Sequence, residues 1–381
     1  MAAASLLCSL AFSGCRQQPA AATSQETLSP AVTSTAEPDA SSDASAAAST
    51  ANPATASGLY RYKAQFLGVF DTVTTVVGLA TDETTFTAYV NRLKDFLTDY
   101  HELYDSFNNY DGVSNIKTIN DQAGIVPVTV SQPVLDLMRQ CLRANSLSGG
   151  QVNMALGPVL EIWHDYREAG LDDPATAALP TQSELSAANQ YTDINQVQID
   201  WEAGTVYLPD AHMSLDVGSG AKGLACERAV EDLVSAGMSN VLLSLGGNVM
   251  AAGYRDGVSE PWKVGIKDPT DEDGQTYIKA VSVSGVSVVT SGVYERYYTV
   301  DGQRYHHIIN PQTLFPDNRY LSVTIIDASS GEADSLTTAL FNMSIEDGKQ
   351  MLSKLDHAEA LWVLNSGEVE YTDGFAAYLV S

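Results

Sequence analysis

Short runs of β-branched and aromatic residues recur through the second half of this chain, and helical patterns separate them at irregular intervals. Such runs predict strands, whereas apolar residues repeating every three to four positions predict helices. The candidate strands are residues 197–199, 205–208, 241–245, 262–266, 280–289, 294–300 and 321–326, and the candidate helices are 221–236, 333–343 and 345–355. This irregular alternation favours an α+β fold with a mixed or antiparallel sheet and packed helices over a regular parallel array.

The first half of the folded region is more helical. Residues 66–80, rich in Val, Thr and Phe, predict a strand or a hairpin, and residues 83–105 and 132–148 predict helices. A Pro- and Asp-rich insertion follows around residues 171–180. Thr181 and Glu184 then form a capping-box pattern that predicts the start of another helix.

The N-terminus has a different composition. Residues 1–14 are apolar, too short to span a bilayer, and end at Cys15 in a pattern that resembles a bacterial lipoprotein box. This predicts a signal peptide over 1–14 and a lipid on the Cys15 sulfur. Residues 16–57 are mostly Ala, Ser, Thr and Pro, which bury too little surface to offset chain entropy, so 15–57 is expected to be a disordered tether. The catalytic domain is expected over 58–381.

Charge and cysteine content narrow the function. The 47 acidic residues exceed the 20 basic ones, giving a net charge of -27, which argues against nucleic acid as a partner. An anionic ligand would need local cations. Cys8, Cys15, Cys141 and Cys226 have no zinc or redox spacing and imply no disulfide framework.

The first motif with chemical content is Ser-Leu-Asp-Val-Gly-Ser-Gly-Ala-Lys-Gly at residues 214–223, between an apolar strand and a helix. Closely spaced glycines let backbone amides approach a ligand, the helix N-terminus is positive, and Lys222 adds a charge. The segment therefore suits a diphosphate. Its spacing matches neither a Walker A loop nor a Rossmann fingerprint, and a purely structural turn is the alternative.

The second motif, Ala-Asp-Ser-Leu-Thr-Thr-Ala at residues 333–339, opens a candidate helix. Asp334 and Thr338 are four residues apart, so their oxygens lie on one helical face and can reach one hard cation. Alternatively, Asp334 caps the helix and the hydroxyl of Thr338 bonds to its own turn.

The third motif comprises residues 290–298 and 304–311, which predict a hairpin around Asp301 and Gly302. Neighbouring residues on a strand face opposite sides, so at most one of His306 and His307 points into a given site.

Together these segments resemble the ApbE family in order and spacing, over roughly residues 60–381. The shared patterns include Gly-x-Ala-Lys-Gly, Ser-Gly-x-Tyr-Glu-Arg, His-His-Ile-Ile-x-Pro and Ala-Asp-x-x-x-Thr. Upstream, residues 66–72 resemble the family's Met-Gly-Thr strand, and 107–120 its Ser-x-Tyr…Ser…Asn segment; 153–163 resemble its glycine-rich stretch before an apolar-Trp pair.

Three positions depart from the family pattern. Val293 and Asn310 stand where the family commonly has Asp, and Thr313-Leu314 stands for its Thr-Gly pair. The two lost charges affect the expected flavin or magnesium affinity, but no proposed metal ligand is missing.

The resemblance implies a two-lobed FAD:protein FMN transferase that uses Mg²⁺ to move FMN from FAD onto a threonine of an acceptor flavoprotein, releasing AMP. By the same resemblance, magnesium is held by the carbonyl of Ala221 with Asp334 and Thr338. The implied catalytic residues are His307, Asp334 and Lys222. The implied FAD-binding residues are Tyr110, Ser219, Gly220, Lys222, Ser291, Gly292, Tyr294 and His307.

Some roles stay open at this level. His307 is preferred over Asp334 as the general base, because a metal-bound carboxylate is a weakened base. Tyr110 is the candidate to stack on a flavin or adenine ring, or is an ordinary core aromatic. An FAD pyrophosphatase and a non-catalytic FAD-binding lipoprotein are the alternative functions. The expected location is the extracytoplasmic face of the bacterial membrane.

Overall fold

The computed structural model describes residues 54–271 and 276–380, all of which belong to the compact unit of residues 32–381. The signal peptide and most of the tether expected from the sequence lie outside these described residues. The backbone amides of Thr55 and Ser57 already donate to the carbonyls of Leu59 and Asp256, so these residues join the folded chain just before the boundary expected at residue 58. None of the helices in the described ranges has the length and apolar character needed to cross a bilayer.

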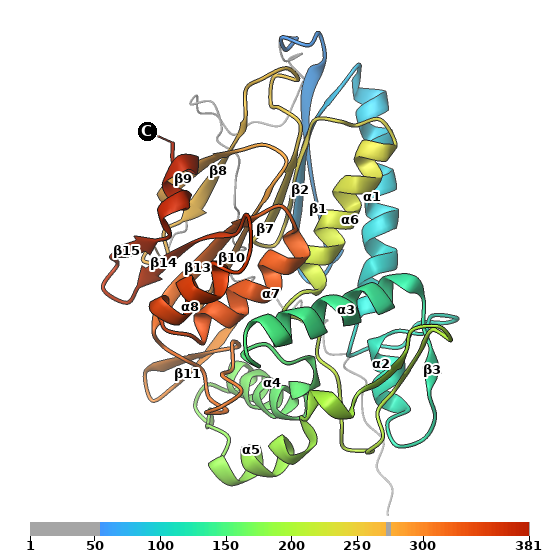
Figure 1. Ribbon diagram of the computed structural model, residues 1–381, viewed down its shortest axis with the longest axis vertical. Helices are drawn as coiled ribbons and strands as arrows, with labels where there is room; N and C mark the ends of the chain where they lie inside the picture. Colours follow the sequence, from blue (N-terminus) through green and yellow to red (C-terminus); the bar gives the residue numbers. More distant parts are fainter. Residues whose placement is uncertain (1–53, 272–275, 381) are drawn as a thin grey trace, which may run out of the picture. The chain divides into compact units, whose positions relative to one another are not determined.

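An eight-stranded sheet in the order β1-β2-β6-β7-β10-β13-β14-β15 organises the domain (Figure 1). Its strands are β1 (Tyr60–Val69), β2 (Thr72–Ala80), β6 (Val241–Leu245), β7 (Asn248–Ala252), β10 (Ser287–Gly292), β13 (Tyr320–Asp327), β14 (Glu359–Leu364) and β15 (Val369–Tyr371). Every pairing between neighbouring strands of this sheet is antiparallel. The α+β class expected from the sequence is confirmed, and of the two sheet types left open the structure has the antiparallel one.

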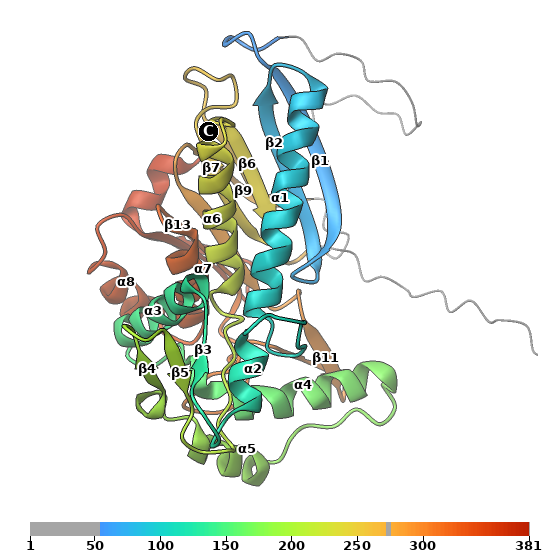
Figure 2. The ribbon, with the colours of Figure 1, turned by 90° about the vertical axis from the view of Figure 1, so that its right-hand side faces the viewer.

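Both faces of this sheet are covered. On one face lie α1 (Glu83–Tyr104), α6 (Ala221–Ser235), α7 (Ser330–Phe341) and α8 (Ile345–Leu352) (Figures 1 and 2). On the other lies the hairpin of β8 (Trp262–Lys267) and β9 (Tyr277–Val283). Neighbouring residues divide between the two layers, as Val76 packs toward α1 and α6 and Val77 toward β8 and β9. The central strands therefore bury apolar side chains on both faces.

The remaining elements form a second region of the fold. They are α2 (Ile116–Asp121), α3 (Gln132–Leu147), α4 (Gly157–Asp172), α5 (Gln182–Ala188), the three-stranded sheet of β3 (Val128–Thr129), β5 (Thr205–Tyr207) and β4 (Gln198–Asp200), and short 3₁₀ turns at Met154–Leu156, Asn189–Tyr191 and Ile194–Gln196. A further 3₁₀ turn, Asp373–Tyr378, packs instead with β8 and β9 on the large sheet. The hairpin of β11 (Tyr297–Val300) and β12 (Gln303–His306) packs on α4 and α5 through a separate apolar cluster.

Several elements differ from the sequence-based expectation. The single strand expected over 280–289 is two strands, because Gly285 adopts φ 70° in a tight turn and sends β9 and β10 into different sheets. The strand expected from residue 294 begins only at Tyr297. The capping box at Thr181 and Glu184 is confirmed, with reciprocal bonds between side chains and backbone.

Candidate active site

The glycine-rich loop ends at the N-terminus of α6, which lies directly against α7. A Cβ added to Gly223 would come within 2.3 Å of the Ser330 carbonyl oxygen, so only glycine permits this approach. The Gly223 backbone N–H then donates to Oδ2 of Asp334 at 2.8 Å. The expected neighbours Lys222 and Asp334 are thereby brought together from segments far apart in the chain.

Gln140 on α3 joins both helix N-termini. Its Nε2 lies 2.7 Å from the Gly331 carbonyl oxygen and 3.3 Å from both the Gly220 carbonyl oxygen and Ser335 Oγ. Because its partners are distant in sequence, no local pattern pointed to Gln140. It holds the loop of Ser219 and Gly220 in place against α7.

Asp334 is inside α7 rather than at its start. The N-cap is Ser329, whose side chain accepts from the Glu332 N–H, so the alternative reading of Asp334 as the cap is wrong. Its side chain is buried, and burial raises its pKa, while Lys222 and the Gly223 N–H act in the opposite direction. Thr338 lies one turn further on and is half-buried. The hydroxyl that bonds to its own turn belongs to the neighbouring Thr337, which donates to the Asp334 carbonyl at 2.7 Å.

These oxygens suit a hard cation. Burial raises the pKa of Asp334, and Oδ1 of the neighbouring Asn248 is buried without a hydrogen-bond partner among the described residues. No group of three or more His, Cys, Asp or Glu side chains able to hold a metal occurs in residues 54–271 and 276–380. A metal held by these residues would therefore need backbone carbonyl, hydroxyl or ligand oxygens among its ligands.

The two histidines have different surroundings. His306 ends β12 and is buried against Phe341; its Nδ1 accepts from the Ile308 N–H, so its Nε2–H donates to the Asp317 carbonyl. His307 follows the strand and is half-buried. Its Nδ1 lies 3.1 Å from the Arg296 carbonyl oxygen. A carbonyl only accepts, so the neutral ring carries its proton on Nδ1 and leaves Nε2 as a proton acceptor.

The charge of Lys222 acts on His307, Glu295 and Asp334, so these residues lie near one another. Burial, together with the nearby positive charges of Arg296 and Lys222, lowers the pKa of His307 to about 3. Burial raises the pKa of Glu295 to about 7, although Lys222, Arg296 and Lys267 partly oppose the shift. Glu295 stood in the third motif without an expected role, because its burial was not visible in the sequence.

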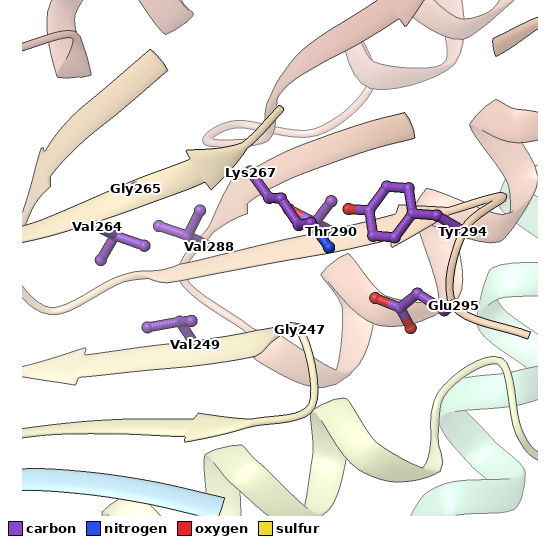
Figure 3. A pocket seen from close by; sticks show the side chains of 9 residues that line it. All are labelled: Gly247, Val249, Val264, Gly265, Lys267, Val288, Thr290, Tyr294 and Glu295. Carbon is purple, nitrogen blue, oxygen red and sulfur yellow. The ribbon is translucent and has the colours of Figure 1, made fainter. Parts of the chain in front are cut away.

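A small pocket opens beside Glu295, between the eight-stranded sheet and β8 (Figure 3). Its floor consists of Val249, Val264 and Val288, and its polar end of Lys267, Thr290, Tyr294 and Glu295. The Lys267 Nζ lies 4.6 Å from the centre of the Tyr294 ring.

Ser291 and Gly292 of the third motif follow Thr290 on β10, and the Ser291 side chain points to the α7 side of the sheet. Ser291 Oγ is 2.8 Å from Thr337 Oγ1 on α7. A Cβ on Gly292 would lie 2.5 Å from the Tyr294 ring, so glycine lets this ring fold back over the strand.

Tyr110 lies apart from Tyr294 and Glu295 but is connected to them through other residues. Its ring contacts His101, which also contacts Phe70 at the tip of the β1–β2 hairpin. Thr72, at the start of β2, packs against Gly246 of the β6–β7 turn, because a Cβ added to Gly246 would lie 2.3 Å from Thr72 Oγ1. The adjacent Gly247 lies close to the Glu295 carboxylate. A series of contacts through the β6–β7 turn thus links Tyr110 to the residues around Glu295 and Asp334.

Replacing Gly223 with alanine is expected to lower the free energy of unfolding by about 1–3 kcal/mol. Alanine favours helix by up to about 1 kcal/mol, but the new methyl group would overlap the Ser330 carbonyl and push α6 from α7. Urea unfolding measures this. The control is Gly218→Ala in the same loop, where the nearest atom is a side-chain oxygen at 3.1 Å. Equal stability of Gly223→Ala and the parent protein would contradict the close-packing argument.

Comparison with known proteins agrees with this arrangement. The profile of the ApbE family matches residues 70–362. The chain belongs to the ApbE family. It is similar to a protein named FAD:protein FMN transferase from Klebsiella pneumoniae (strain 342), with 34% identity over 261 residues, covering 67% of this chain and 77% of the relative. It is also similar to the Treponema pallidum (strain Nichols) protein of the same name, with 36% identity over 276 residues, covering 68% and 74%. Among solved structures, the ApbE protein of Thermotoga maritima aligns with a TM-score of 0.73 and 27% identity, covering 84% of this chain and 100% of that one.

The departures from the ApbE pattern now have structural contexts. Leu314, at the family's glycine position, adopts φ 65°, a left-handed conformation that glycine favours. It is buried, and its carbonyl accepts from the Trp163 Nε1–H at 2.9 Å, so packing holds the strained backbone. Asn310 is buried, and its Oδ1 accepts from the Gln312 N–H at 2.8 Å. Val293 packs against the apolar cluster of α7 and β13.

Proposed function

We propose that this member of the ApbE family is a Mg²⁺-dependent FAD:protein FMN transferase, which transfers FMN from FAD to a threonine hydroxyl of an acceptor flavoprotein and releases AMP. The observation that carries the proposal is the convergence of His307, Lys222 and Asp334 at the N-terminus of α6. Relatives that carry the name FAD:protein FMN transferase support the same reaction.

The metal would be held by the carbonyl oxygen of Ala221, the carboxylate of Asp334 and the hydroxyl of Thr338. This set of hard oxygen donors leaves positions for phosphate and water, as Mg²⁺ prefers. When bound, the metal would supply Lewis-acid stabilisation of phosphate charge. Lys222 adds a further positive charge, which matters in a chain of net charge -27.

The α6 N-terminus would hold the diphosphate of FAD. Ser219 and Gly220 precede the first turn of α6. The Gly223 N–H of that turn donates to Asp334, and the Gly220 and Ala221 N–H groups donate to the Val217 carbonyl, so the positive end of the helix dipole would supply the attraction for the anion. Ser291, Gly292 and Tyr294 would line the adjoining wall. Tyr110, at the opposite end of the site, would stack on the flavin.

His307 is the favoured base for the acceptor hydroxyl. The threonine oxygen forms a bond to the FMN phosphorus, the bond from that phosphorus to the bridging oxygen breaks, and AMP leaves with that oxygen. The threonine proton passes to Nε2 of His307, because Nδ1 is committed to the Arg296 carbonyl. The pKa of about 3 makes the free imidazole a weak base, and the negative diphosphate would raise it once FAD is bound.

Two other functions use the same residues. In an FAD pyrophosphatase water replaces threonine, and in an FAD-binding lipoprotein no reaction follows. Incubation with FAD and Mg²⁺, with and without a candidate acceptor, separates all three. Flavin bound covalently to the acceptor after denaturation supports the transferase, free FMN and AMP without acceptor support the pyrophosphatase, and intact FAD under all conditions supports the binding protein.

The enzyme is also proposed to be lipid-anchored at Cys15, outside the cytoplasm, with the Ala-, Ser- and Thr-rich segment before residue 54 as the link to its folded domain. Cys15→Ser is expected to move the protein from the membrane to the soluble fraction without changing its transfer rate, because Cys15 lies outside the described folded domain of residues 54–380. Fractionation of cells measures this, and Cys141→Ser, which alters a buried cysteine of the folded domain, is the control. Identical distribution of parent and Cys15→Ser would rule out lipidation at this residue.

A further inference from the structure

The loop after α1 carries a carboxylate that bonds to Tyr110. Oδ2 of Asp105 accepts the Tyr110 hydroxyl at 2.8 Å and Asn108 Nδ2 at 3.0 Å. Its Oδ1 accepts the backbone N–H groups of Phe107 at 2.6 Å and Asn108 at 3.1 Å. One oxygen therefore shapes the loop, and the other determines where the Tyr110 ring lies.

The same segment is firmly attached to the diphosphate loop. The Asn120 side chain accepts from the Leu215 N–H at 2.7 Å and donates to the Leu215 carbonyl at 3.0 Å. Leu215 lies five residues before Gly220 in the glycine-rich motif. Asp105 itself contributes its carbonyl, which accepts from the Lys117 N–H at 2.9 Å at the start of α2. Tyr110 and the α6 N-terminus thus belong to one connected frame.

The Tyr110 ring is only partly enclosed by its surroundings. Tyr110 is half-buried, and its ring meets His101 only edge-on, with ring centres 6.4 Å apart. The residues around it, from Phe107 to Asn109, are exposed. The hydrogen bond to Asp105 is therefore a specific restraint on the position of this side chain.

We infer that Asp105 is a positioning residue for flavin binding, which holds the Tyr110 ring ready for stacking before FAD arrives. The inference rests on the proposed role of Tyr110 in the transferase site. Ordering a side chain in advance removes part of the entropy cost of binding, so the effect appears in FAD affinity. The four hydrogen bonds to Asp105 outweigh the opposing effect of its burial and lower its pKa, so the carboxylate is charged at neutral pH.

The test compares Asp105→Asn, Tyr110→Phe and the double variant with the parent protein. Asp105→Asn keeps an oxygen for the two backbone N–H groups but loses the charged acceptor of the Tyr110 hydroxyl, and Tyr110→Phe keeps the ring but loses the hydroxyl. Each single variant is expected to raise the dissociation constant of FAD by about 2- to 10-fold, and the double variant no further. The control Asp111→Asn changes an exposed carboxylate of the same loop and should bind FAD like the parent.

The difference absorbance spectrum of bound flavin tests this directly, because it would not change if Asp105 only stabilised the fold. The stacking signal at saturating FAD should shrink in Asp105→Asn and Tyr110→Phe while the unfolding midpoint stays near that of the parent. Unchanged affinity and spectrum in both variants, or losses that add in the double variant, would overturn the inference. If Asp105→Asn does not fold, Tyr110→Phe decides alone, since it leaves the loop bonds of Asp105 intact. A parent protein that binds FAD but transfers none would refute the proposed function and leave the role of Asp105 standing.

Discussion

Replacing Asp334 with asparagine is expected to reduce Mg²⁺-dependent transfer by on the order of 10³-fold, because Lewis-acid stabilisation of phosphate charge is worth several kcal/mol. Asp334 supplies the one charged ligand of the proposed metal site. Asparagine keeps an oxygen that can accept the Gly223 N–H, so the contact between α6 and α7 should persist. Isothermal titration of Mg²⁺ into the FAD complex, alongside the transfer assay, measures the loss of binding separately from the loss of rate.

The fold should tolerate this change. Because the pKa of Asp334 is raised in the folded protein, its ionisation costs folding free energy as pH rises through the ordinary carboxyl range. At pH 7 the neutral Asp334→Asn variant is therefore expected to be at least as stable as the parent. Thr338→Val keeps the shape and loses one neutral oxygen, so it should weaken Mg²⁺ binding less.

Glu332→Gln is a suitable control on the same helix, since that carboxylate pairs with Arg143 and faces away from the proposed ligands. It should leave transfer and Mg²⁺ affinity unchanged. The metal assignment fails if Asp334→Asn and Thr338→Val both retain the parental Mg²⁺ half-saturation.

Local patterns predicted the elements whose signal is contained in their own residues. The strand at Val241–Leu245 is confirmed at both ends, because a short apolar run buried on both faces is bounded by a Gly-Gly turn. The strands Asn248–Ala252 and Glu359–Leu364 were missed. The first is five residues long and follows that turn directly, and the second begins with a glutamate. Their pairing with neighbouring strands, rather than their own sequence, makes them strands.

The site residues also divide into those that a local pattern predicts and those that only the fold brings into place. Motifs led to Lys222, Asp334 and His307 because each lies in a compact local pattern. Asp105 follows α1 and Gln140 lies within α3, and each bonds to groups that only the fold or a loop conformation brings near. A lone acid or amide of this kind has no local pattern to mark it. Glu295 became notable through its burial, which depends on the β6–β7 turn packing against it.

Replacing His307 with alanine is expected to lower transfer by roughly 10²- to 10⁴-fold while FAD and Mg²⁺ still bind, as for the loss of a positioned proton acceptor. The hydrogen bond from Nδ1 to the Arg296 carbonyl supports this, because it turns Nε2 outward as the basic nitrogen. FAD affinity and covalent flavin yield on an acceptor, measured for the same preparation, separate binding from chemistry.

His306→Ala tests whether the effect belongs to His307 alone. His306 is 3% exposed, packs on Phe341 and bonds to Asp317 and Ile308, so its loss should lower stability and leave the rate of the folded protein nearly unchanged. At pH 7 His307 is neutral in the free protein, since its pKa is lowered to about 3, so the basic form needs no activating deprotonation. Transfer losses of the same size in both variants, or a loss of FAD affinity that accounts for the whole loss at His307, would reduce it to a binding residue and make Asp334 the better candidate base.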